Sequence, residues 1–176
     1  MRILMSLLIG CLLLTPSYAT DIGASADTGQ FHYRVTQIDL GQTPGNRLSV
    51  QALLGFEITN TGKVPVRIAI VPVWPAIQLE GAGLQLQLAW RGITGVASFW
   101  SGSTANCTQG AADFTLLRPN STVIGNLVLE GRLPDPDLPV AQRARFTASV
   151  MVQSLEDKQC WIEPFSVANV PVSIRH

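Results

Sequence analysis

Apolar residues recur at every second position along several segments of the chain, and the alternation is clearest between residues 47 and 71. Before the turn sequence Asn60-Thr61-Gly62-Lys63 the apolar positions are Leu48, Val50, Ala52, Leu54, Phe56 and Ile58, and after it they are Val64, Val66, Ile68 and Ile70. Because successive side chains of a strand point to opposite faces, this spacing predicts two strands, each with one buried face. Gly62 supplies the backbone freedom of a short loop, so we expect a β-hairpin joined at residues 60–63.

The same alternation recurs on both sides of this segment. Phe31, Tyr33 and Val35 share one face, but the pattern changes phase at Ile38 and Leu40, as a β-bulge produces. Two prolines within residues 71–75 lack the N–H that a sheet ladder uses, so we expect this segment at a sheet edge or in a crossover. Further short strands are expected within residues 77–79, 84–90, 96–100, 114–117, 123–129, 146–152, 160–167 and 170–174.

These segments together predict the fold class. Apolar residues at the helical spacing i, i+3, i+4, i+7 are missing beyond the N-terminal region. About eight or nine strands with turns rich in Gly, Pro and Asn predict an all-β protein, an antiparallel β-sandwich of one domain over residues 31–176. Residues 20–30 have few apolar side chains and are expected to form a flexible arm. The Pro-rich segment 131–142 is expected to be a crossover or surface loop.

The first 19 residues have the features of a secretory signal peptide. Arg2 precedes an apolar run over residues 3–14, and small residues lead up to Ala19. This run is shorter than the ~20 residues that a membrane-spanning helix needs, so we expect cleavage after Ala19 and no membrane segment afterwards. The protein is then expected in the periplasm, secreted or at the cell surface. In the alternative, Leu8-Ile9-Gly10-Cys11 resembles the lipobox of bacterial lipoproteins, which would place a lipid on Cys11.

Two cysteines remain after this cleavage, Cys107 and Cys160. An even number of cysteines in an exported chain predicts a disulfide between them. On the chain-entropy model such a bond stabilises the fold by up to about 4 kcal/mol. The sequons at Asn106 and Asn120 matter only where the host glycosylates exported proteins.

Two stretches resemble exported bacterial immunoglobulin-like domains, among them telokin-like and BsuPI-like accessory modules. The first is Glu57-Ile58-Thr59-Asn60-Thr61-Gly62-Lys63-Val64-Pro65-Val66, and the second is Leu117-Arg118-Pro119-Asn120-Ser121-Thr122-Val123. Asn120 stands where such domains more commonly have glycine. The resemblance implies an immunoglobulin-like sandwich and a class of proteins in which binding roles are common. Because these motifs are turn chemistry shared by unrelated functions, they carry no specific activity.

Charge and titratable residues give few signs of catalysis. The formal net charge is zero and the arginines are scattered, so the sequence lacks the basic patch of a nucleic-acid-binding protein. A zinc or copper site would need histidines brought together, whereas His32 and His176 lie at opposite ends of the domain. Asp135 and Asp137 provide too few oxygen ligands for calcium. We therefore expect a protein that is not an enzyme and holds no metal or cofactor.

Aromatic and proline residues beside loops are the candidates for contact with a partner. Trp74 and Trp100 flank loops, whereas Trp90 and Trp161 are expected in the core, and tryptophan often anchors interfaces. The predicted function is a non-enzymatic module that contacts another envelope or extracellular protein in an inhibitory, assembly or surface-associated role. In the alternative, a small molecule or carbohydrate stacks on Trp74 or Trp100. The candidate contact residues are Trp74, Phe99, Trp100, Pro136 and Pro139.

Overall fold

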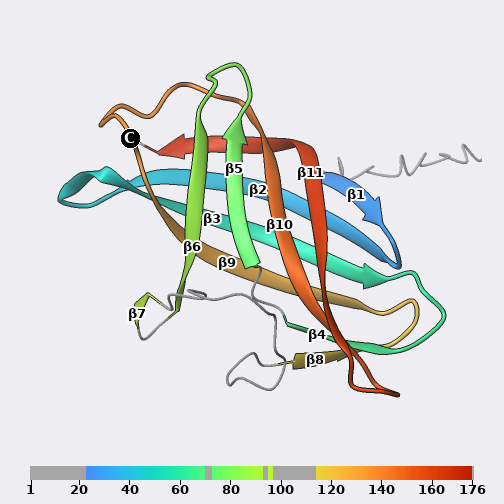
Figure 1. Ribbon diagram of the computed structural model, residues 1–176. Helices are drawn as coiled ribbons and strands as arrows, with labels where there is room; N and C mark the ends of the chain where they lie inside the picture. Colours follow the sequence, from blue (N-terminus) through green and yellow to red (C-terminus); the bar gives the residue numbers. More distant parts are fainter. Residues whose placement is uncertain (1–22, 70–72, 93–94, 97–113, 176) are drawn as a thin grey trace, which may run out of the picture.

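The computed structural model describes residues 23–69, 73–92, 95–96 and 114–175, and these ranges form strands without a helix (Figure 1). The all-β prediction is thereby confirmed. Within the described ranges no helix is both long and apolar enough to cross a bilayer. The strands are β1 (Ala24–Thr28), β2 (Phe31–Thr43), β3 (Asn46–Asn60), β4 (Val66–Ala69), β5 (Val73–Leu79), β6 (Gln85–Gly92), β7 (Gly95–Val96), β8 (Phe114–Leu117), β9 (Thr122–Arg132), β10 (Arg143–Ser154) and β11 (Cys160–Arg175).

The strands close into a barrel. Each strand pairs with the next in the order β2, β3, β9, β6, β5, β10 and β11, and β11 then pairs with β2. The β11–β2 pair is parallel and the others are antiparallel. Outside this ring β1 pairs with β2, β4 with β10, β8 with β4, and β7 with β6. The prediction of a sandwich of eight or nine strands is therefore wrong, because the described residues form an 11-stranded sheet in which seven strands close into a ring.

The barrel has two walls, one formed by β2, β3 and β9 and the other by β5 and β10. β6 and β11 close the barrel because each of them pairs with both walls. Residues 85–87 of β6 pair with β5, and residues 88–90 pair with β9. β11 pairs with β10 up to Pro171 and then with β2 from Val172 onward. Between these halves Ala168 and Asn169 together oppose one residue of β10, and Asn169 has a φ of 60°. This bulge redirects β11 from one wall to the other.

The predicted hairpin at residues 60–63 is wrong. β3 pairs with β2 and β9, whereas β4 pairs with β10 and β8, so the turn crosses from one wall of the barrel to the other. The alternation correctly predicts the two strands and most of their buried positions. Leu48 and Val64, however, are exposed, and Ile70 lies outside the described residues. The buried faces of both strands point to the same interior, but from opposite sides. An apolar stripe is expected both for two strands of one hairpin and for two strands in opposite walls of a barrel. The stripe therefore does not distinguish a hairpin from a crossing turn.

The phase change in the first long strand is confirmed as a bulge. Val35 pairs with Phe56 and Ile38 with Leu54, so Thr36 and Gln37 together oppose Gly55. The extra residue keeps the apolar residues on both sides of the bulge facing inward, and Val35 and Ile38 are buried.

The expectation of a flexible arm over residues 20–30 is wrong for Ala24–Thr28, which form β1. This short strand pairs antiparallel with the first half of β2, from Ala24 opposite Val35 to Thr28 opposite Phe31. The alternation that identifies a strand is weak here, because small and polar residues cover only one partly buried face.

The interior of the barrel holds one hydrophobic core. Near one end of the core Tyr33 stacks on Phe165 with ring centroids 4.1 Å apart and an interplanar angle of 1°, and Phe146 contacts Phe165 in a tilted arrangement. The largest side chains that are fully buried are Tyr33, Phe31, Phe146, Ile38, Leu40, Ile58, Ile68, Ile77, Leu79, Leu86, Leu117 and Leu129.

Candidate functional site

Trp74 lies near the start of β5 in an unusual backbone conformation. Val73 pairs with Ser149 and Ala76 with Thr147, so Trp74 and Pro75 together oppose Ala148 as a bulge. The φ of Trp74 is 50°, and Trp74 is 62% exposed. A left-handed conformation costs a residue with a side chain about 1–2 kcal/mol, and a following proline favours an extended conformation instead. The fold therefore presents this indole to solvent against the preference of its own backbone.

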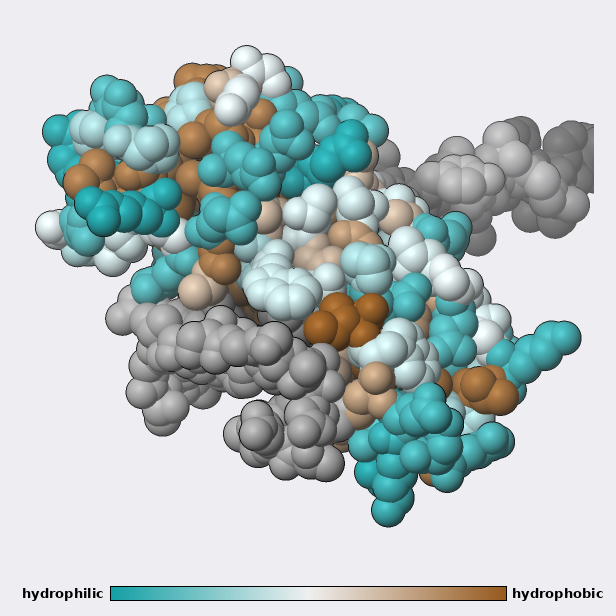
Figure 2. Space-filling model, in the orientation of Figure 1, coloured by the Kyte–Doolittle hydropathy of each residue, from teal (hydrophilic) through white to brown (hydrophobic). Residues whose placement is uncertain are grey.

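Beside Trp74 an open groove of about 550 Å³ crosses β11 from β10 to β1. Its residues include Thr147, Ser149 and Ser166, whose hydroxyls are suited to hydrogen bonding, and the carboxylate residue Asp27. Over β5, β10 and β11 the surface carries small hydrophobic patches separated by neutral and hydrophilic residues (Figure 2). The Trp74 groove, lined by Ala26, Asp27, Thr28, Trp74, Thr147, Ala148, Ser149, Pro164, Phe165 and Ser166, thus combines an aromatic platform with polar groups.

The Pro-rich loop lies at the far end of β5 from Trp74. Pro136 and Pro139 belong to the segment between β9 and β10, and Ala144 just beyond it pairs with Leu79 at the end of β5. Trp74 and Leu79 lie five positions apart along β5, which corresponds to roughly 17 Å. The structure therefore does not bring the described candidates together at one site.

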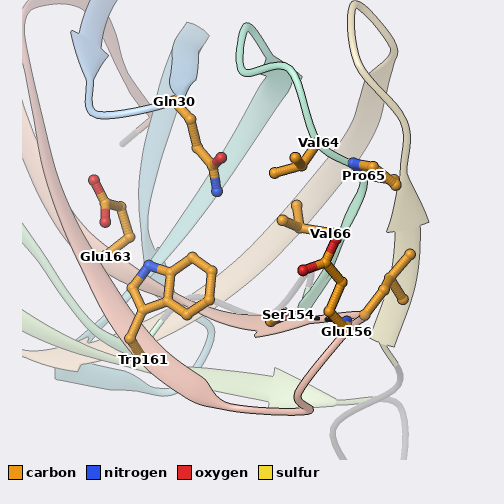
Figure 3. A pocket seen from close by; sticks show the side chains of 9 residues that line it. Gln30, Val64, Pro65, Val66, Ser154, Glu156, Trp161 and Glu163 are labelled. Atoms are coloured by element: carbon orange, nitrogen blue, oxygen red, sulfur yellow. Dashed lines mark hydrogen bonds between the residues drawn. The ribbon is translucent and has the colours of Figure 1, made fainter.

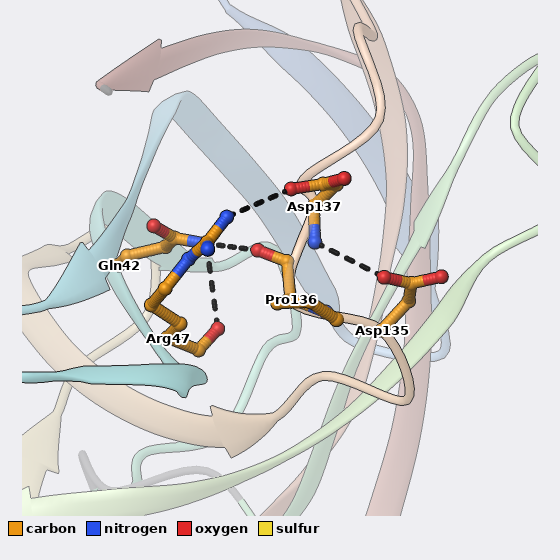
Figure 4. Close-up of polar contacts among 5 residues, drawn as sticks. All are labelled: Gln42, Arg47, Asp135, Pro136 and Asp137. Atoms are coloured by element: carbon orange, nitrogen blue, oxygen red, sulfur yellow. Dashed lines mark hydrogen bonds and ion pairs between the residues drawn. The ribbon is translucent and has the colours of Figure 1, made fainter.

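Contacts with the end of β2 and the start of β3 hold this loop in place (Figure 4). Gln42 donates a hydrogen bond from Nε2 to the carbonyl oxygen of Pro136, and Arg47 Nη2 lies 3.1 Å from Asp137 Oδ1. Asp135 Oδ1 accepts from the backbone N–H of Asp137 at 3.4 Å. The two aspartates thus stabilise the loop itself.

Several sequence-predicted candidates lie outside the described residues. Phe99, Trp100 and Cys107 all belong to this group. Cys160 is the first residue of β11, and its predicted disulfide with Cys107 stays a prediction. The side chain of Trp90 is likewise outside what the structure describes.

A second cavity, of about 420 Å³, opens at the end of the barrel opposite the Pro-rich loop. The β1–β2 turn, the β3–β4 turn and the β10–β11 turn converge there, and Gln30, Val64 and Trp161 face one another across it (Figure 3). Trp161, expected in the core, only partly packs against it and forms one wall of this cavity. The barrel-mouth pocket is lined by Gln30, Val64, Pro65, Val66, Ser154, Leu155, Glu156, Trp161 and Glu163.

Sequence reasoning missed this pocket because its residues come from four separate segments. Val64 and Leu155 are exposed apolar residues, at 52% and 37%, although the alternation places Val64 on the buried face of a strand. The alternation of Trp161 and Glu163 on one face of a strand was the only available signal.

Tyr33 and Thr28 each have a buried hydroxyl group. Neither Tyr33 Oη nor Thr28 Oγ1 makes a hydrogen bond within the described residues, although both atoms are buried. Burial raises the pKa of the Tyr33 phenol, the neighbouring Thr28 hydroxyl opposes this shift, and the Glu163 carboxylate adds to it. The phenol therefore remains neutral at ordinary pH.

His32 lies on the outer face, as its place in the alternation predicts. Its Nδ1 is 2.7 Å from Asp27 Oδ1, and both residues are substantially exposed. Within the described ranges no group of three or more His, Cys, Asp and Glu side chains is placed to hold a metal ion.

Comparisons with known proteins identify no family. No family model matches the chain, and no curated protein matches it in sequence. Among solved structures, structural-genomics target SoR45 is 12% identical with a TM-score of 0.42, covering 82% of this chain and 90% of that one. The putative ApaA protein from Bordetella pertussis is 16% identical with a TM-score of 0.40, covering 79% and 93%. The apo PCuAC domain from PmoF1 is 14% identical with a TM-score of 0.35, covering 85% and 99%.

At these values the similarities do not establish a shared fold. The all-β architecture rests on the strand pairing of this chain, and the immunoglobulin-like class stays a prediction.

Proposed function

We propose that this chain is a non-enzymatic, exported binding module that contacts another protein of the cell envelope or exterior through the surface around Trp74. Export is expected from the N-terminal sequence. The contact surface consists of the Trp74 indole and the adjoining groove, which can receive a side chain of the partner.

The observation that carries this proposal is the combination of backbone strain and exposure at Trp74. With 62% of the residue exposed, burial of the indole in this chain offsets little of the cost of a φ of 50°. Strained residues cluster at functional sites, where the strain is part of the geometry that function needs. A Trp held at a fixed angle is also a typical anchor of protein interfaces, since it brings a large contact area with few rotatable bonds.

A second candidate function is favoured by the hydroxyl groups of the same groove. Thr147, Ser149 and Ser166 offer donors and acceptors beside an aromatic face, and Asp27 adds a carboxylate. Such a lining also suits a saccharide, whose ring stacks on an indole while its hydroxyls form hydrogen bonds.

The test uses Trp74→Gly, Trp74→Ala and the control Ile124→Ala, which removes an apolar residue that is 72% exposed on β9. We expect Trp74→Gly to be about 1 kcal/mol more stable than Trp74→Ala in urea denaturation, because glycine accepts the left-handed conformation. We also expect both Trp74 variants to lose at least about 2 kcal/mol, or roughly 30-fold, in affinity for a partner captured from envelope extract.

Ile124→Ala should bind that partner as the parent chain does. If both Trp74 variants bind normally, the proposed surface is wrong. If a glycan array gives the Trp74-dependent signal and the envelope extract gives none, the saccharide candidate replaces the protein partner.

A further inference from the structure

The barrel-mouth pocket combines an aromatic wall, an apolar wall and two carboxylates. Trp161 stands on β11, and Val64, Pro65 and Leu155 come from the turns around it. At about 420 Å³ the pocket is within the size range of small-ligand sites, roughly 300–1,000 Å³, and barrel mouths are common places for such sites. Its size suits a side chain or another small group.

Glu163 is held in place at the side of this pocket. The β1–β2 turn has glycine at position 29 with a φ of 52°, and a Cβ there would lie 2.7 Å from Glu163 Oε1. The carboxylate therefore packs directly against the backbone of the turn. Glu156 is placed by the β10–β11 turn, where its N–H donates to Ser154 Oγ at 3.2 Å.

Among the described residues, no cation forms an ion pair with either carboxylate. The ion pairs of the described residues involve other acidic side chains, and those of Glu156 and Glu163 take part in none. Lys63 and Lys158 belong to two of the turns that form the pocket, but neither pairs with these carboxylates. The pocket thus presents uncompensated negative charge beside an indole face.

The chemistry that fits all three walls is an organic cation on an aliphatic stem. An indole face attracts a guanidinium or ammonium group through its quadrupole, and a carboxylate at its edge adds an ion pair. Lysine and arginine also pack their methylene stems on apolar surface while the charged end stays near solvent. A bare metal ion fits less well, because calcium takes six or more oxygen ligands and the apolar wall offers none.

We propose that the barrel-mouth pocket binds an arginine or lysine side chain of a partner polypeptide, with the cation over Trp161 and beside Glu163, while Glu156 adds negative charge on the other side of the pocket. This site is separate from the Trp74 groove. It does not depend on the function proposed for that surface.

The test follows the tryptophan indole N–H signals of the chain beginning at Thr20 by two-dimensional NMR. The signals of Trp161 and Trp74 are assigned from Trp161→Phe and Trp74→Phe. The probes are Nα-acetylarginine amide and Nα-acetyllysine amide. Nα-acetylcitrulline amide is the neutral control of nearly the same shape as the arginine probe.

We expect both basic probes to shift the Trp161 indole signal and to bind at least about tenfold more tightly than the citrulline probe. Glu163→Gln should weaken arginine binding about threefold, and Glu156→Gln/Glu163→Gln about tenfold, at low salt. Glu80→Gln, in an exposed carboxylate at the other end of the barrel, should leave binding unchanged.

Three results would overturn the proposal. These are equal affinity for arginine and citrulline probes, unchanged binding in the folded double variant, and no shift of Trp161 at probe concentrations up to the solubility limit. A shift of the Trp74 signal alone would place the cation in the Trp74 groove, which also contradicts the proposal. The spectrum of each variant shows whether it is folded, so a loss of binding is not confused with unfolding.

Discussion

At the scale of single residues, Tyr33 fits the apolar pattern with its ring but also buries a polar hydroxyl group. Its ring belongs to the core and stacks on Phe165, as the alternation with Phe31 and Val35 predicts. Its hydroxyl is buried without a hydrogen-bond partner in the described chain. The sequence predicts that the ring is buried. Whether the hydroxyl finds a hydrogen-bond partner depends on β1 and β11, whose positions relative to Tyr33 are set by tertiary packing.

The raised pKa of Tyr33 makes a prediction at alkaline pH. Because the folded-state pKa lies above that of the unfolded chain, the neutral phenol contributes its full stabilisation below about pH 10, and this is lost as pH rises through the folded-state pKa. In the chain beginning at Thr20, Tyr33 is the sole tyrosine of the sequence. We expect no tyrosinate absorbance from the folded protein at about pH 11, whereas the urea-unfolded chain titrates near pH 10.

Tyr33→Phe is the matched variant, because it keeps the ring stack and removes the unpartnered hydroxyl. Its free energy of unfolding at pH 7 should be equal to that of the parent chain or up to about 1 kcal/mol higher. It should also lose less stability than the parent between pH 9 and pH 11. A folded parent chain that titrates near pH 10 would contradict this account.

At the scale of elements, the turn between β3 and β4 shows what the alternation leaves undetermined. The pattern located the strands and their inward faces, yet their partners come from other parts of the chain. The burial of Asn60 distinguishes this crossing turn from a hairpin turn. Asn60 is fully buried, whereas the corresponding residue of a hairpin turn would lie near the surface. Its Nδ2 donates to the carbonyl oxygens of Val64 and Leu117 at 2.9 and 3.1 Å, and its Oδ1 accepts from Gly62 N–H at 2.9 Å.

Asn60→Ala should therefore be strongly destabilising. It removes the side-chain donor from the buried carbonyl of Leu117 and the partly buried carbonyl of Val64, and one of the two acceptors of the Gly62 N–H, which together costs about 2–3 kcal/mol in the free energy of unfolding. Asn60→Asp should cost at least as much at neutral pH, because its carboxylate would face two carbonyl oxygens. Urea denaturation measures both variants, with the exposed Thr61→Ala as control, expected within about 0.5 kcal/mol of the parent chain. A loss of under about 1 kcal/mol in Asn60→Ala would fit a surface turn instead.

The candidate sites divide in the same way between what sequence shows and what packing decides. Trp74 was identifiable as an aromatic beside prolines, but its left-handed backbone results from the register of β5 on β10. The barrel-mouth pocket unites Gln30, Val64 and Trp161, which are far apart in the sequence and approach only because three turns meet at one end of the barrel. No local pattern carries that information.

At the scale of the whole molecule, the last strand decides whether the sheet is open or closed. The alternation over residues 170–174 predicted a strand, but its parallel partner is the second half of β2 near the other end of the chain. The same β11 was expected as two strands, since Ala168 and Asn169 interrupt the pattern where the bulge redirects the chain. A sandwich and a barrel therefore look alike in the sequence, because they differ in the pairing of strand halves and share the inward apolar positions.

Deleting residues 172–176 tests this closure. The truncated chain loses the pairing of Val172–Arg175 with Ile38–Gly41, and it uncovers the core on which Val172 and Ile174 pack. Two half-buried apolar side chains and the lost ladder hydrogen bonds together correspond to about 3–5 kcal/mol in the free energy of unfolding. Hydrogen exchange should rise first at those backbone N–H groups of residues 38–41 that point toward β11, because the alternate N–H groups stay paired with β3.

Two controls separate closure from local effects at the C-terminus. Deleting His176 alone should change neither stability nor exchange. Arg175→Ala removes the exposed ion pair with Asp39, whose atoms are 2.9 Å apart, and should cost under about 1 kcal/mol. If the deletion of residues 172–176 costs no more than Arg175→Ala and leaves exchange at residues 38–41 unchanged, β11 does not close the barrel in solution. The two walls would then behave as an open sandwich, as the sequence alone suggested.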